Sequence, residues 1–330
     1  MPAVGPNAEA LHAALAAVAP GTPLRDGLDR IVRAKMGALV VLGDGPDVLA
    51  ICSGGFLLDS PYSPQRLSEL AKMDGAIILA SDGTRIARAN VHLVPDPTVP
   101  TSETGTRHRT AERVARSLNV PVVSVSEEMS VINVYAGGQK HQVQDIARLL
   151  DRANQALQTL ERYKARLDDA LSTLTSLELE DLVTVRDVAA VVQRGDMVHR
   201  LATELETMII ELGVDGRLLR LQLEELYGEI DEEIDLVHHD YPTITGNYAG
   251  SGLDGDASTS PLGLRLLTRV PRMTATLASA VVDRFGELAK IQRATVRELA
   301  EVSGIDEDHA AAIKDTLDRL TESSILDQYH

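Results

Sequence analysis

Over the first 140 residues, apolar residues alternate with polar ones or cluster in short runs, as in β-strands separated by turns. The runs at 38–43 and 48–55 are separated by Asp-Gly-Pro-Asp, which predicts that they form a hairpin. The runs at 75–80 and 85–94 flank the turn Ser-Asp-Gly-Thr and predict a second hairpin.

Helical spacing of apolar residues separates these strands from two more. Segment 63–73 opens with serine and proline, a common helix start, and a further helix is expected at 108–119. Runs rich in valine and isoleucine at 120–126 and 131–138 predict the last strands. Strands mixed with covering helices predict a mixed-sheet α/β domain over residues 1–140.

The pattern changes to a 3.6-residue period between residues 141 and 240, without runs of β-forming residues. Three long amphipathic helices are expected at 146–174, 185–212 and 217–240. Together they predict an all-α connector or spine, and the fold class is therefore multidomain α/β plus all-α. Segment 241–261 is rich in Gly, Ser and Thr, which predicts a linker or mobile loop.

The last part, 262–330, is expected to form four or five short helices. Segments 270–285 and 302–317 align with each other, because each has an apolar residue, a tight hairpin and an alanine-rich helix. This repeat predicts a tandem helix-hairpin-helix domain. Such hairpins direct backbone N–H groups at a phosphate, so they bind DNA without reading its sequence.

Composition narrows the class of protein. The 330 residues include no tryptophan and two phenylalanines, so the cores must be aliphatic. One cysteine, Cys52, excludes an intramolecular disulfide and indicates a reducing compartment. The N-terminus lacks the pattern of a signal peptide, and no apolar run approaches the roughly 20 residues of a membrane span. We therefore expect a cytoplasmic protein without a membrane partner, associated with the nucleoid where it binds DNA.

Charge is distributed unevenly along the chain. The net charge of −17 argues against general coating of nucleic acid. Segment 265–297, however, carries seven basic residues against two acidic ones, whereas segment 298–330 carries two against nine. The second hairpin also has Asp306 in place of the glycine of a phosphate-binding hairpin. DNA contacts are therefore expected from the basic residues Arg265, Arg269, Arg272, Lys290, Arg293 and Arg297.

The most specific chemistry lies where a helix is expected to begin. Arg107, His108 and Arg109 are consecutive and lie among threonines, an arrangement that repels itself unless an anion is present. Asp74 and Gly75 precede a predicted strand and suit a metal-bound triphosphate, because Mg²⁺ is commonly held by one carboxylate and phosphate oxygens. The chain has no Walker-type loop, so this phosphate site is not a P-loop.

Simpler interpretations remain open for single residues. The basic triplet is also compatible with a solvated turn before a helix, and Asp74 with a turn residue before a strand. His238 and His239 end a predicted helix, where exposure is more common than metal binding. Cys52 is expected to be a small core residue rather than a nucleophile.

Two short motifs carry a resemblance to a known family. Asp-Gly-Ala at 74–76 and Gly-Thr-Arg-His-Arg-Thr at 105–110 resemble the signatures of diadenylate cyclase domains. The order of cyclase domain, helical connector and tandem helix-hairpin-helix resembles the DisA family of DNA integrity scanning diadenylate cyclases over essentially the whole chain. The resemblance implies condensation of two ATP into cyclic di-AMP and two pyrophosphates, with Mg²⁺ or Mn²⁺, across facing sites of a homo-octamer.

The resemblance also implies roles for individual residues. Asp74 is expected to hold the metal and the 3′-hydroxyl, and Leu93 to pack against adenine. Catalysis is assigned to Asp74, Arg107, His108 and Arg109, and ATP binding to Gly75, Ala76, Leu93, Thr106, Arg107, His108, Arg109 and Thr110. Branched DNA bound by the C-terminal domain is expected to modulate synthesis. The rival hypothesis is a DNA-structure binding scaffold that senses nucleotide without turnover.

Overall fold

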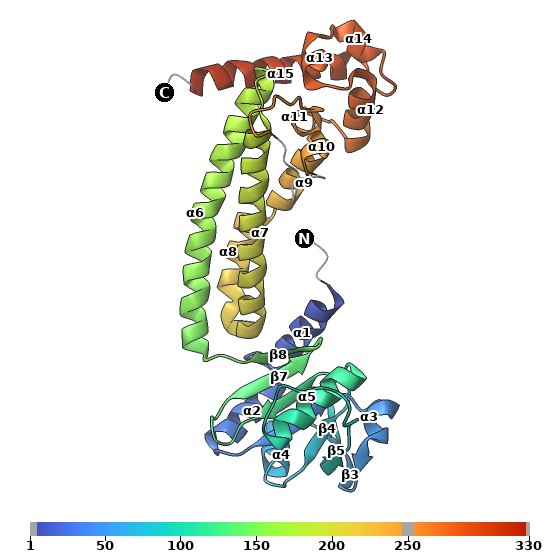
Figure 1. Cartoon of the computed structure of the whole chain (residues 1–330), viewed down its shortest axis with the longest axis vertical. Helices are drawn as coiled ribbons and strands as arrows, with labels where there is room; N and C mark the ends of the chain where they lie inside the picture. Colours follow the sequence, from blue (N-terminus) through green and yellow to red (C-terminus); the bar gives the residue numbers. More distant parts are fainter. Residues whose placement is uncertain (1–4, 246–253, 328–330) are drawn as a thin grey trace. The chain divides into compact units, whose positions relative to one another are not determined.

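The computed structural model describes residues 5–245 and 254–327, with side chains described to residue 323 (Figure 1). The chain divides into two compact units. The first unit comprises Met1–Gln155 with Glu204–Gln222, and the second comprises Ala156–Thr203 with Leu223–His330. In the described part, no helix is both long and apolar enough to cross a membrane.

A mixed eight-stranded sheet forms the centre of the first unit, in the order β2-β5-β4-β1-β6-β7-β8, with β3 also paired to β5. Only β1 and β4 run parallel, with Leu39 opposite Ala76, and the other pairs are antiparallel. The strands are β1 (Ala38–Leu42), β2 (Cys52–Ser53), β3 (Phe56–Pro61), β4 (Ala76–Leu79), β5 (Arg85–Leu93), β6 (Val122–Val125), β7 (Ile132–Ala136) and β8 (Gln139–Gln142).

Strand alternation builds two separate aliphatic cores, one on each face of the sheet. Val40 and Ile77 pack with α1 (Pro6–Ala17), α2 (Pro23–Arg33) and α4 (Pro64–Leu70). The neighbouring positions on the same strands face α3 (Pro46–Ala50) and α5 (Thr106–Leu118). Both faces of the central strands are therefore buried, which explains why their sequences are continuous apolar runs.

One predicted hairpin is wrong and the other is confirmed. Residues 46–50 form helix α3 rather than strand, because Pro46 lies in its first turn and suits a helix start. Strand β2 pairs with β5 instead of β1, whose two edges are taken by β4 and β6. The predicted hairpin at 75–94 is confirmed as the antiparallel pair β4–β5.

The connector is helical, as the 3.6-residue period predicts. It consists of the long helices α6 (Ile146–Leu179) and α7 (Val185–Leu212), the 3₁₀ turn η1 (Gly213–Gly216), and the helices α8 (Arg217–Tyr227) and α9 (Ile230–Asp240). The third predicted helix is broken into α8 and α9 at Gly228, a residue that weakens a helix interior. Within the first unit, buried Glu211 of α7 accepts hydrogen bonds from Gln144 N at 2.6 Å and His141 Nε2 at 2.8 Å.

The C-terminal region of the second unit is all-α, as predicted. Its helices are α10 (Pro242–Thr245), α11 (Leu264–Leu267), α12 (Ala275–Phe285), α13 (Leu288–Arg293), α14 (Val296–Ala300) and α15 (Glu307–Asp327). The segment expected as a linker or mobile loop, 241–261, is anchored near both ends. Tyr241 is buried, and Thr259 N donates to Val183 O at 2.9 Å. The centre of that segment, 246–253, lies outside the described residues.

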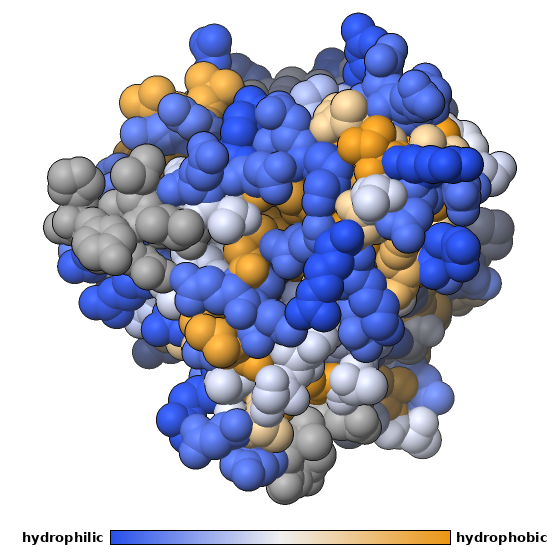
Figure 2. All heavy atoms as spheres, turned by 90° about the horizontal axis from the view of Figure 1, so that it is seen from above, coloured by the Kyte–Doolittle hydropathy of each residue, from blue (hydrophilic) through white to orange (hydrophobic). Residues whose placement is uncertain are grey.

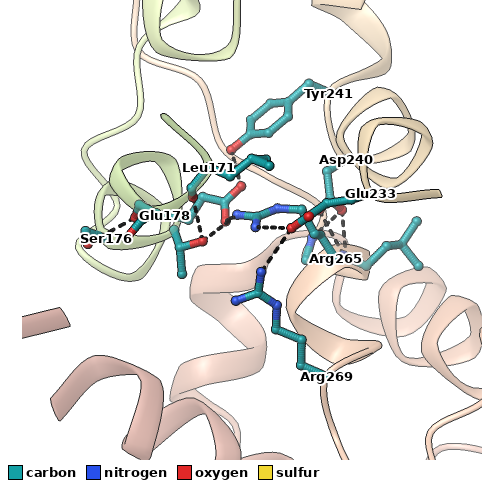
Figure 3. A network of polar contacts seen from close by, with 12 residues as sticks. Leu171, Ser176, Glu178, Glu233, Asp240, Tyr241, Arg265 and Arg269 are labelled. Carbon is teal, nitrogen blue, oxygen red and sulfur yellow. Dashed lines mark hydrogen bonds and ion pairs between the residues drawn. The ribbon is translucent and has the colours of Figure 1, made fainter. Parts of the chain in front are cut away.

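A buried polar network holds α11 against α6 (Figure 3). Arg265 is 1% exposed and donates from Nη2 to the carboxylate of Glu178 and, at 3.0 Å, to Thr175 Oγ1. Tyr241 donates to the same carboxylate at 2.8 Å. Asp240 accepts the N–H groups of Gly263, Leu264 and Arg265 at 2.9, 2.6 and 3.0 Å, which caps α11.

This burial corrects the prediction that Arg265 contacts DNA, because its guanidinium is enclosed by protein and already neutralised by Glu178. Segment 265–297 therefore presents a less basic surface than the sequence suggests. Arg265 belongs to the packing of the second unit.

Removing either partner of this pair should destabilise the second unit by about 3–5 kcal/mol, because it leaves an uncompensated buried charge. Glu178→Gln and Arg265→Met should each lower the urea concentration at half unfolding, followed by circular dichroism. The double variant Glu178→Leu/Arg265→Met should recover most of the loss. As a control, Arg319→Gln removes an exposed pair with Asp315 and should change the unfolding free energy by at most about 0.5 kcal/mol. Single variants that unfold like the parent chain would refute this role.

Candidate nucleotide site and DNA-binding surface

The parallel pairing of β1 with β4 brings the beginnings of both strands to one edge of the sheet, where the start of α5 also lies. A cavity of about 800 Å³ opens there, within the size range of ligand pockets. Its lining comprises Leu39, Asp74, Gly75, Ala76, Val91, His92, Leu93, Gly105, Thr106, Arg107, His108, Thr110, Ser126, Glu127 and Glu128.

The cavity brings together both sequence motifs, although residues 77–104 separate them. Of the residues assigned to catalysis or ATP binding, Arg109 alone does not line it in the described chain; its side chain is exposed. Sequence reasoning missed Ser126, Glu127 and Glu128, which lie after β6. The adjacent glutamates after a strand were the available signal, but only the pairing of β6 with β1 brings them to this edge.

Two glycines leave space for neighbouring groups beside the cavity. A Cβ on Gly75 would lie 2.6–2.7 Å from backbone atoms of Asn90, so no larger residue fits. A Cβ on Gly37 would lie 2.1 Å from Arg107 Nη1. With Gly37 beneath it, the guanidinium of Arg107 reaches Asp74, with Nη2 3.4 Å from Oδ1.

Helix α5 begins at Thr106, two residues before the predicted start, so the basic triplet forms its first turn. Gly105 precedes the helix and provides no side-chain cap, and the first turn contains no acidic residue. The first N–H groups and the positive end of the helix dipole therefore add to the charge of Arg107. This combination favours an anion such as a triphosphate.

Buried polar contacts fix the segment before α5. Glu112 accepts hydrogen bonds from Ser102 N at 2.9 Å and from Thr101 Oγ1 at 2.5 Å. Burial alone would raise the pKa of Glu112, but these hydrogen bonds and Arg116 outweigh it, and the pKa lies below its ordinary value. The anchored segment also carries Glu103, which accepts from Tyr135 behind His108.

The donor set fits a hard divalent cation held largely by a substrate. The Asp74 side chain is almost fully exposed, at 99%, and forms an ion pair with Arg107. No cluster of three His, Cys, Asp or Glu that could hold a metal occurs in residues 5–245 and 254–323. Asp74 would therefore supply one oxygen, and a bound triphosphate the others.

The two C-terminal hairpins share their backbone geometry. Arg272 and Gly304 occupy equivalent positions and both have positive φ, 63° and 89°. The caps also correspond, because Thr274 accepts from Leu277 N at 3.3 Å and Asp306 from His309 N at 2.7 Å. In the second hairpin the carboxylate of Asp306 thus occupies the helix N-terminus that a phosphate would need.

The remaining basic residues that were expected to contact DNA differ in whether they form ion pairs within the protein. Arg269 pairs with Glu233 at 3.1 Å and Lys290 with Glu287 at 3.4 Å. Arg272, Arg293 and Arg297 are exposed and have no ion-pair partner among the described residues. The face seen from above is mainly hydrophilic, with separated hydrophobic areas (Figure 2).

Family models match nearly all of the chain. Residues 25–140 match the model described as DisA bacterial checkpoint controller nucleotide-binding, and residues 143–250 match that of the DisA linker region. Residues 264–319 match a SAM-like helix-hairpin-helix tandem. The three matches follow the order expected from the sequence.

Two solved structures each match about a third of the chain. A hypothetical membrane spanning protein from Bacillus cereus is 22% identical, with a TM-score of 0.34 over 37% of this chain and 62% of that one. DacA from Staphylococcus aureus is 27% identical, with a TM-score of 0.30 over 37% of this chain and 85% of that one. These scores are too low to support an argument about the fold.

Full-length relatives are more informative. The DNA integrity scanning protein DisA of Frankia casuarinae is 50% identical, over 98% of this chain and 99% of the relative. That of Streptomyces coelicolor is 47% identical, over 97% of this chain and 94% of the relative. The chain therefore belongs to the DisA family of DNA integrity scanning proteins.

Proposed function

We propose that this chain is a diadenylate cyclase that converts two ATP into cyclic di-AMP and two pyrophosphates. The observation that carries the proposal is the cavity in which Asp74, Arg107 and the start of α5 converge. In each half-reaction, the 3′-hydroxyl oxygen of one ATP bonds to the α-phosphorus of the other and releases its proton to solvent. The bond from that phosphorus to the pyrophosphate breaks. Two such steps close the ring.

Several groups at the cavity have a proposed role in this reaction. Arg107 and the N–H groups of Thr106 and its neighbours would bind the triphosphate and the charge that develops on the leaving pyrophosphate. Gly75 allows the nucleotide to approach the backbone, and Leu93 provides an apolar surface for adenine. His108 lies beside these groups, with one ring nitrogen held by Ser124 at 2.8 Å.

Mg²⁺ or Mn²⁺ is the cation proposed for Asp74, because both accept oxygen ligands. When bound, such an ion neutralises phosphate charge and polarises the reacting phosphorus. Asp74 itself would orient the 3′-hydroxyl, and its contact with Arg107 would be exchanged for substrate.

Two copies of the chain are required, because one cavity holds one ATP and the reaction joins two. The octamer is an expectation from the family resemblance. Strand β3 forms part of a sheet edge and exposes Phe56 and Leu57 by 55% and 75%, an apolar surface suited to a second copy. Arg109 is exposed beside the cavity and would be available to the facing nucleotide.

The C-terminal domain is proposed to bind branched DNA and thereby to modulate synthesis. Support comes from the helix-hairpin-helix match and from the unpaired arginines of the first hairpin and its surroundings. Because the second hairpin is capped by Asp306, binding should depend on few phosphate contacts and be weak at high salt.

Asp74→Asn should abolish formation of cyclic dinucleotide from ATP with Mg²⁺ or Mn²⁺, resolved by chromatography, with a loss of at least about 100-fold. The amide keeps the shape of Asp74 but removes the charge that binds the cation. Asp82→Asn is the matched control, because Asp82 lies in the exposed turn at the far end of β4, and it should retain activity. A parent chain that binds ATP but makes no product with either metal would favour the nucleotide-sensing scaffold.

Replacing Arg272 and Arg293 together by glutamine should weaken binding of a four-way DNA junction. Each lost phosphate contact should reduce the slope of log affinity against log salt by about 0.9. Fluorescence anisotropy at several salt concentrations measures both quantities. Arg319→Gln removes one positive charge from the acidic α15 and should leave the slope unchanged. An unaltered slope in the double variant would exclude these arginines as the contact site.

A further inference from the structure

A polar cluster interrupts the otherwise aliphatic sheet face beneath α5. Ser124 and Asn133 are cross-strand partners on β6 and β7 and are fully buried, and Tyr135 is 1% exposed. The side chain of Asn133 has no hydrogen-bond partner among the described residues. Burial of such groups costs stability, so their presence behind His108, which lines the cavity, indicates a functional requirement.

Ser124, Tyr135 and Glu103 form a chain of polar contacts behind His108. His108 Nδ1 lies 2.8 Å from Ser124 Oγ and 3.2 Å from Tyr135 Oη. Tyr135 lies 3.2 Å from Glu103 Oε1, and Lys140 Nζ contacts the same oxygen at 2.6 Å. Lys140 is the cross-strand partner of Tyr135, so β7 and β8 fix both ends of this contact.

Chemistry sets the direction of one of these hydrogen bonds. An ionised carboxylate only accepts, so Tyr135 donates to Glu103. The oxygen of Tyr135 can then accept from Ser124, a contact that lowers the pKa of Tyr135. With Ser124 donating to Tyr135, the Ser124 oxygen accepts from His108 Nδ1–H, and all three protons point from the imidazole towards the carboxylate.

We propose that Ser124, Tyr135 and Glu103 are positioning residues that keep the proton of His108 on Nδ1. This inference rests on the proposed function, which it deepens by assigning the ring nitrogen that meets the nucleotide. Nε2 is the nitrogen left for the cavity, where it takes up a proton from solvent and, in the resulting imidazolium, donates to a phosphate oxygen. The same arrangement orients histidines elsewhere in proteins through a hydrogen bond to the opposite nitrogen.

Charged groups around the ring determine how this arrangement responds to pH. Burial lowers the pKa of His108, Glu103 opposes this, and Lys140 and Arg107 add to it. A hydrogen-bond acceptor for Nδ1–H stabilises the charged ring more than the neutral ring. Loss of this acceptor therefore lowers the pKa of His108 further.

Tyr135→Phe in the full-length chain tests the proposal, because it removes one oxygen from these polar contacts and keeps the aromatic ring. Long-range ¹H–¹⁵N spectra of histidine rings report the tautomer and the pKa of His108, which is assigned from the spectrum of His108→Gln. Turnover of ATP with Mg²⁺ is measured over pH 5.5–9 alongside. Tyr62→Phe is the matched control, because Tyr62 donates to Pro23 O elsewhere in the same unit.

In Tyr135→Phe we expect a lower His108 pKa, a larger fraction of the Nε2–H tautomer and a parallel shift of the pH–rate profile. The value of kcat/KM should fall about tenfold, the loss of one hydrogen bond. Tyr62→Phe should show none of these changes. An unchanged tautomer and pKa in Tyr135→Phe would overturn the proposal.

Two further outcomes are separable. If Tyr135→Phe does not fold, Glu103→Gln is measured in the same way, and an unchanged His108 pKa there overturns the proposal. The spectra require no turnover. A parent chain that makes no cyclic dinucleotide therefore refutes the proposed function, while the tautomer of His108 still decides whether these residues position it.

Discussion

The parallel pairing of β1 with β4 is the constraint on which the nucleotide cavity depends. It is the one parallel pair among strands that otherwise run antiparallel, and it brings the beginnings of two buried strands to the same edge. Gly37 and Gly75 lie just before these strands; a Cβ on Gly75 would overlap the Asn90 backbone, and a Cβ on Gly37 would displace the guanidinium of Arg107. Asp74 and Arg107 lie within 3.4 Å of each other although they belong to separate motifs.

The same sheet links the cavity to the connector within the first unit. Strand β8 carries Lys140, which contacts Glu103 behind the cavity, and His141, which contacts Glu211 of α7. Glu211 is 3% exposed, so this attachment is fixed by a buried carboxylate with two donors. Strand β8, at the edge of the sheet, thus contacts both Glu103, which lies behind His108, and the end of helix α7.

The sequence predicted well those features that depend on local chemistry. The periodicity of apolar residues and the helix-start residues predicted most strands, the long helices and the repeated hairpins. The two motifs predicted which residues would lie together at the cavity. Features set by pairing across the chain were missed. The helix at 46–50 displaced an expected strand because Pro46 suits a helix start, and nothing local indicated that β2 would pair with β5.

Arg265 shows that the surface charge also depends on contacts between distant parts of the chain, which the sequence did not predict. In the sequence it is one of several basic residues in a short segment, and only the packing of α11 on α6 reveals that Glu178 neutralises it. Charge density along a chain is therefore a poor measure of charge on a surface. In the second unit the arginines without partners among the described residues matter for a polyanion, because pairs such as Arg269–Glu233 must first be broken. The second hairpin cannot compensate for the paired arginines, because the carboxylate of Asp306 occupies the helix end that a phosphate would otherwise use.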